Sequence, residues 1–295
     1  MPKIKAVLKK TWIFVAAAAI IAGSSYTMAY ALNNNTAEVA SVNAAPPTAV
    51  SDGMVQTQAP KTETTAEYSV IDLSKNRSEK KDLITDKLKR IEGITPEEIE
   101  KKYNEIIAAM TPADKDISAE QAAAYAADIL KKAYGVDFTG YTAEASFSRN
   151  PVPNSDNWTV IFHAPGEDAN SKRYIASVDS VNGKMLDAGC YNLMFREDAG
   201  INPEEISENL DDPQWLIKAE QAVSVLMPED VSITGRRVVF SSRDTGVTAV
   251  FDLSDGSAIS VRLTGRSMEA AAYIYFPNGY DGSLGPKPLS ENGVG

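Results

Sequence analysis

Two stretches of the chain repeat one pattern, in which an amphipathic helix is followed by segments that alternate apolar and polar residues. Apolar residues recur three and four positions apart in both helices, which is the spacing of one helix face. The sequence Ala-Glu-Gln-Ala occurs in each helix, at residues 119–122 and again at 219–222. The chain therefore predicts an α+β fold of two tandem small modules, at 113–191 and 213–277, each a helix packed on an antiparallel β-sheet.

The first module has clear start and stop signals for its helix. Ser118 and Gln121 predict a capping box, in which each side chain binds the backbone N–H of the other residue. Gly135 predicts the end of the helix. Asn182-Gly183 predicts a two-residue type I′ hairpin, which needs positive φ at both positions. Alternating residues predict strands near residues 141–147, 158–162, 174–178 and 185–190.

The second module has the same kinds of signal. Asp212 predicts the N-cap of its helix, Pro213 occupies the first helical position, and Pro228 ends the helix. Asp255-Gly256 predicts a hairpin between two of the strands that follow. Those strands are predicted at residues 231–241, 247–253, 257–264 and 270–276.

Three other segments surround the modules. Residues 74–112 predict a helical pair or a bent helix, because Thr95, Pro96 and Glu98 form a helix start between two apolar stripes. The stripes predict a core of their own or packing on the next module, with a partner-binding helix as the alternative. Residues 192–212 predict a linker that contains a short helix at 203–209. Residues 278–295 are rich in glycine and proline and predict a flexible tail.

The N-terminus has the three parts of an export signal. Four lysines precede an apolar run from Trp12 to Ala22, and Ala29-Tyr30-Ala31 has the small-x-small pattern of a cleavage site. Residues 1–31 therefore predict a cleaved signal peptide, and residues 11–32 are alternatively long enough to remain as a membrane anchor. Both alternatives place the rest of the chain outside the cytoplasm. Residues 32–73 lack periodicity and predict a disordered linker.

The charge balance excludes one class of partner. The chain has 29 basic and 40 acidic residues, and all of the acidic residues follow Ala31. A surface this acidic repels nucleic acid and anionic membranes. We therefore expect no nucleic-acid partner, and contact with a membrane only through the N-terminal segment.

The residue types of common catalytic sites are scarce. The chain has one histidine, His163, and one cysteine, Cys190, so an intrachain disulfide is impossible and a zinc site is improbable. Alternation places His163 on the other face of its strand from Trp158, Val160 and Phe162. It is predicted to be an ordinary histidine near a strand end. The acidic pairs lie at helix starts, where negative charge is favourable. The sequence predicts a non-enzymatic protein with no cofactor and no metal.

One local cluster of basic residues interrupts the acidic second module. A solvated sheet face is the simplest interpretation, and a docking patch for an acidic partner or an anionic wall polymer is the alternative. The residues of this possible partner-binding patch are Arg236, Arg237, Arg243, Arg262 and Arg266.

The chain resembles the PepSY family. The resemblance lies in the Ala-Glu-Gln-Ala helices and in the hairpin segment 178–186, where a strand, an aspartate, a glycine turn and a return strand follow one another. Segment 251–259 echoes this hairpin in the second module. The resemblance implies a small exported bacterial α+β unit without catalytic residues, of the kind found in peptidase propeptides and in surface proteins that restrain peptidases or wall hydrolases.

These observations lead to two functional hypotheses. The first is a non-enzymatic exported protein that binds and regulates another exported or membrane protein, such as a peptidase or cell-wall hydrolase. The second is a membrane-anchored envelope structural or sensor protein that binds anionic wall polymer through its arginines.

Overall fold

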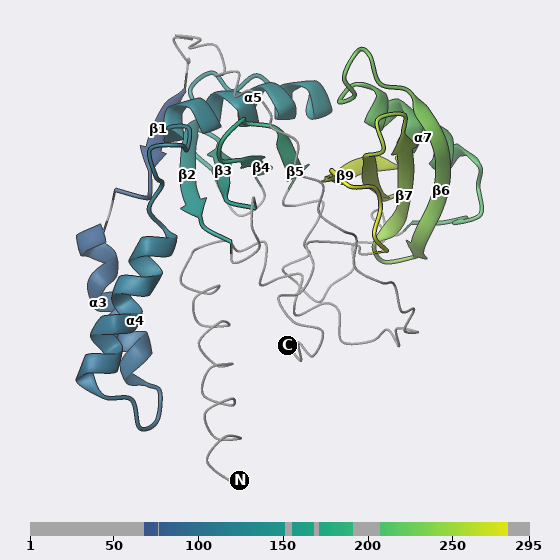
Figure 1. Ribbon diagram of the computed structural model, residues 1–295. Coiled ribbons are helices and arrows are strands. Elements are labelled where there is room, and N and C mark those ends of the chain that lie inside the picture. The colour runs from purple at the N-terminus through teal and green to yellow at the C-terminus, as the bar shows by residue number, and fades with distance from the viewer. Residues whose placement is uncertain (1–67, 76, 151–154, 168–170, 191–206, 283–295) are drawn as a thin grey trace, which may run out of the picture.

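The computed structural model describes residues 68–75, 77–150, 155–167, 171–190 and 207–282. They form a mixed α and β fold around one nine-stranded sheet, with strands in the order β1-β2-β3-β4-β5-β9-β8-β7-β6 (Figure 1). The strands are β1 (Ser69–Asp72), β2 (Thr142–Ser148), β3 (Asn157–His163), β4 (Tyr174–Asp179), β5 (Met185–Cys190), β6 (Ile233–Ser242), β7 (Gly246–Leu253), β8 (Ala258–Thr264) and β9 (Glu269–Phe276). The helices are α3 (Arg77–Lys89), α4 (Pro96–Ala109), α5 (Ala119–Tyr134) and α7 (Gln214–Ser224).

The first half of the sheet confirms the predicted helix and strands. α5 begins at the capping box of Ser118 and Gln121 and ends at Gly135, which has a left-handed φ of 68°. β2, β3, β4 and β5 then pair with their neighbours in chain order as an antiparallel meander. α5 lies over these four strands and over β1. Small side chains permit this close contact, since its buried face includes Ala119, Ala122, Ala123 and Ala126.

The second half also contains the predicted helix and four strands. β6, β7, β8 and β9 form another antiparallel meander. α7 begins one residue later than predicted, because Pro213 occupies the N-cap position and Asp212 Oδ1 accepts the backbone N–H of Gln214 at 2.8 Å. The helix lies over β7, β8 and β9. Its buried side chains are Trp215, Ala219 and Val223.

The two halves share one sheet because their last strands pair. β5 and β9 are antiparallel, with Ala188 opposite Tyr273 at the centre of the pairing. Both residues belong to the same core as the buried side chains of α5 and α7, so the two helices cover one face of the sheet. The sequence predicts the eight strands that follow the two helices but carries no signal for this joint.

The turn between β4 and β5 differs from the predicted one. Gly183 has a φ of 71°, but Asn182 does not have positive φ, so the type I′ turn is wrong. Asp179 Oδ1 instead accepts the backbone N–H groups of Val181 and Asn182 at 2.9 and 3.0 Å. The Asp179 N–H donates to the carbonyl of Lys184 and closes a longer loop. An aspartate that binds the amides two and three residues ahead favours this loop over the two-residue turn.

The predicted linker at 32–73 ends in regular structure. β1 lies within it and pairs in parallel with β2, with Ser69 opposite Thr142. The remaining linker, the N-terminal segment 1–31 and most of the segments 192–212 and 278–295 lie outside the described residues. The short helix predicted at 203–209 falls mostly outside them too, and residues 207–209 are not helical. No helix among the described residues is long and apolar enough to span a membrane.

The predicted helical segment is a hairpin of two helices, α3 and α4. The start of α4 has the capping box of Thr95 and Glu98, with Pro96 in the first turn. The hairpin has its own small core around Ile84 and Leu88, separate from the core of the sheet. It projects away from the sheet beside β1 (Figure 1).

Candidate functional site

The five arginines of the predicted patch do not form one surface. Arg236 and Arg237 are consecutive on β6 and therefore point to opposite faces of the sheet. Arg236 lies opposite Phe251 of the main core, whereas Arg237 lies opposite Val250 of a small cluster on the other face. The others are distributed over β8 and two turns, at Arg262, Arg243 and Arg266.

Three of these arginines have carboxylate partners. Arg236 forms an ion pair with Glu220 of α7, and Arg237 forms one with Asp252 of β7. Arg266 Nη2 lies 3.0 Å from Glu208 Oε1. In residues 207–282 the sequence has six basic and eleven acidic residues. The second half is therefore acidic as a whole, and Arg236, Arg237 and Arg266 pair with carboxylates of this same half.

Gly235 makes room for one of these ion pairs. A Cβ at this position would lie 2.8 Å from Asp252 Oδ2, so the absence of a side chain lets the carboxylate extend across β6. The Arg237 guanidinium also lies over the Tyr280 ring, 5.4 Å from its centroid. The hydrogen bond to Asp252 raises the pKa of Arg237 further above its usual value. Arg237 is therefore held as a fixed cation beside the edge of the sheet.

The edge strand β6 is the most open element of the described sheet. It is the last strand in the sheet order, so one row of its backbone N–H and C=O groups has no neighbouring strand. None of its ten residues is buried, and Val238 and Phe240 are 48% and 41% exposed. Its register with β7 shifts at two places, between Ile233 and Gly235 and between Val238 and Phe240. Such bulges prevent indiscriminate strand pairing and leave only short regular segments for a partner.

His163 lies at the end of β3, on the face predicted from alternation, with carboxylates on both sides. Its Nδ1 lies 2.9 Å from Glu167 Oε2 and its Nε2 lies 3.3 Å from Glu144 Oε2. Burial opposes ionisation of Glu167, but hydrogen bonds from Arg173 and His163 outweigh it and lower the pKa of Glu167. His163 on β3 therefore contacts Glu144 of β2 and Glu167 of the following turn, and we interpret its role as holding these elements together.

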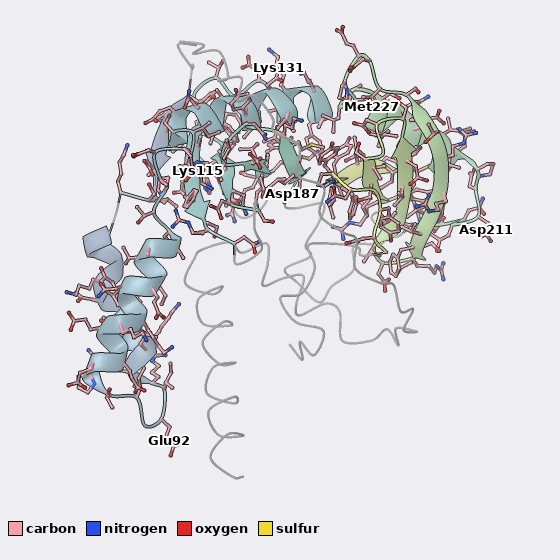
Figure 2. The ribbon with its side chains drawn as sticks, in the orientation of Figure 1. Glu92, Lys115, Lys131, Asp187, Asp211 and Met227 are labelled. Carbon is pink, nitrogen blue, oxygen red and sulfur yellow. The ribbon has the colours of Figure 1, made fainter. Side chains whose placement is uncertain are left out.

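A carboxyl group at the joint of the two halves was not singled out from the sequence. Asp187 of β5 lies opposite Ser177 of β4 and opposite Ile274 of β9 (Figure 2). Burial raises the pKa of Asp187 to about 6, although Ser177 donates hydrogen bonds that act in the opposite direction. Its Oδ1 is buried and has no hydrogen-bond partner among the residues that the structure describes. The acidic residue within a predicted strand was the available signal, whereas the pairing of that strand on both sides could not be read from the sequence.

Cys190, the last residue of β5, is buried and only 1% exposed. Within the described residues, no group of three or more His, Cys, Asp or Glu side chains is arranged to hold a metal ion.

No family model, curated protein or solved structure matches this chain.

Proposed function

We propose that this protein is an exported, non-enzymatic regulator that binds an extended segment of another envelope protein along β6. The observation that carries the proposal is the open edge of β6, with its exposed Val238 and Phe240. An extended peptide can add a strand to such an edge, where backbone hydrogen bonds give affinity and alternate side chains give specificity.

The ion pairs on β6 favour a protein partner over a wall polymer. An anionic polymer would have to compete with Glu220 for Arg236 and with Asp252 for Arg237. It would also approach a region in which acidic residues outnumber basic ones. A peptide that pairs with the backbone of β6 can leave both ion pairs in place.

The class of target comes from the resemblance to PepSY modules. Two such modules on an exported chain suit a protein that restrains a peptidase or cell-wall hydrolase. The N-terminal segment would keep the regulator at the outer face of the cytoplasmic membrane, or release it after cleavage near Ala31.

The test is affinity capture from the membrane and wall fraction with the full chain as bait. The variant Val238→Asp/Phe240→Asp places two charges on the open edge. Ile71→Asp is the matched control, because Ile71 is 40% exposed on β1 at the opposite edge of the sheet. We expect one protein to be retained by the wild type and the control at moderate salt, and about tenfold less of it by the β6 variant.

Two outcomes would contradict the proposal. Equal retention by the β6 variant would exclude this edge as the binding site. Recovery of wall polymer alone, released by salt and lost in Arg236→Glu/Arg237→Glu, would favour the envelope-binding alternative.

A further inference from the structure

The α3–α4 hairpin has too small a core to stand alone. Among the hairpin side chains that the structure describes, Ile84 and Leu88 are the buried members of its own cluster, and α4 has no buried residue. Burying two such side chains contributes roughly 3–6 kcal/mol, whereas ordering a single residue costs about 1–2 kcal/mol. The partly exposed apolar residues around this core are Ile91, Ile94, Ile99, Tyr103, Ile106 and Ile107.

The hairpin is nevertheless held in a fixed direction. The Arg149 N–H at the end of β2 donates to the carbonyl of Ala109 at 2.7 Å, and its guanidinium donates to the carbonyl of Thr111 at 3.3 Å. These bonds fix the base of the hairpin to the sheet. Glu92 marks the opposite end, which lies far from the sheet (Figure 2). The described part of the sheet therefore leaves most of the hairpin surface uncovered.

The charges of the two helices are complementary. α3 has five basic and three acidic residues, and α4 has two basic and four acidic residues. Residues 77–110 as a whole carry eight of each sign, in a chain whose net charge is −11. The hairpin is therefore a neutral element through which two copies of this acidic chain can approach each other without net repulsion.

We infer that the hairpin is a dimerisation arm that packs against the same arm of a second copy of this chain. In a two-fold arrangement, α3 of each copy lies beside α4 of the other, so that basic and acidic helices alternate. The four helices then enclose the apolar residues that two helices leave only partly buried, as in a four-helix bundle. This inference goes beyond the proposed function and uses a surface at the opposite end of the sheet from β6.

Sedimentation velocity of the full chain tests this inference. We expect a dimer at micromolar concentration, weakened about tenfold or more by Ile106→Asp, with Val238→Asp as a control that leaves it intact. A monomeric wild type, or a dimer that Ile106→Asp does not weaken, would overturn the inference.

A charge exchange keeps the test valid if Ile106→Asp unfolds the arm. Glu97→Lys/Glu100→Lys makes α4 basic, and Lys87→Glu/Lys89→Glu makes α3 acidic. We expect each variant alone to dimerise about tenfold more weakly and the mixture to recover a heterodimer. Failure of the mixture to associate, or capture of a different envelope protein by the arm in place of a second copy, would contradict the inference.

Discussion

The two halves of the sheet have the same order of elements but differ in how far the helix covers the outer strand. In the first half, α5 is 16 residues long and lies over β2, β3, β4 and β5 and also over β1, which pairs outside β2. In the second half, α7 is 11 residues long and lies over β7, β8 and β9. The residues of β2 alternate between buried and half-buried, whereas β6 has no buried residue.

The difference arises from the lengths of the helices. Gly135 ends α5 after four turns, whereas α7 is already over when the chain reaches Pro228, which cannot continue a helix. A helix one turn shorter covers less of the sheet, and the outermost strand is left open. The same local pattern thus leaves the outer strand of one half covered by a helix and the outer strand of the other half largely uncovered.

The largest effect is expected from a matched pair of glycine substitutions, one in each half. Gly246 has a φ of 84°, and an added Cβ would lie 1.9 Å from the carbonyl oxygen of Leu263. Because backbone atoms cannot move aside, we expect Gly246→Ala to reduce the free energy of unfolding by about 3–5 kcal/mol. Urea unfolding monitored by circular dichroism measures this change.

The counterpart in the first half is Gly183→Ala. Its φ is 71°, and its added Cβ would meet the ring of Tyr125 at 2.3 Å. A side chain can rotate away, so we expect a smaller loss of about 1–3 kcal/mol. An equal loss of unfolding free energy in Gly183→Ala and Gly246→Ala would contradict this expectation. It would mean that the Tyr125 side chain resists displacement as strongly as the backbone at Leu263 does.

The joint between the halves should make stability depend on pH through Asp187. Its pKa is raised from its ordinary value of about 4 to about 6. As pH rises through this interval, the unfolded state loses its proton before the native state does, so the free energy of unfolding falls. We expect Asp187→Asn to stabilise the protein by on the order of 2 kcal/mol at pH 7.5, and by little at pH 3.5.

Urea unfolding at both pH values gives this comparison. Asp128→Asn is the control, because Asp128 is exposed on α5 beside Lys132. A pH dependence that persists unchanged in Asp187→Asn would assign the effect to another group.

The smallest effect is expected at the helix starts. Ser118 takes part in a complete capping box, whereas Asp212 accepts one backbone N–H ahead of α7. We expect Ser118→Ala to reduce the free energy of unfolding by about 1 kcal/mol, and Asp212→Ala by less. Thermal unfolding of the two variants measures the difference, and the reverse order would show that α7 depends more on its cap than α5 does.

The sequence predicted the elements that local periodicity determines. The boundaries of α5 follow from Ser118, Gln121 and Gly135, and four strands follow each helix as predicted. β1 was missed because its four residues follow a polar segment and are paired by a strand about seventy residues away. The pairing of β5 with β9 leaves no mark in the sequence, since backbone hydrogen bonds do not depend on residue type.

The candidate site was predicted only in part. Arg236 and Arg237 were identified as exposed residues of the second module, and both lie on the open strand. Their partners Glu220 and Asp252 come from other elements, and neighbouring residues on a strand face opposite ways. A cluster defined by closeness in sequence therefore could not show that these charges are already paired.

The joint between the halves, the pairing of β5 with β9 at Ala188 and Tyr273, has a consequence for the rate of folding. Every pairing within β2–β5 and within β6–β9 joins strands that follow each other along the chain, so its entropic cost is small. The joint closes a loop of more than eighty residues, and three pairs of residues face each other across it. We expect each half to form rapidly from local contacts. The pairing of β5 with β9 is then expected to form in the final, slower step of folding.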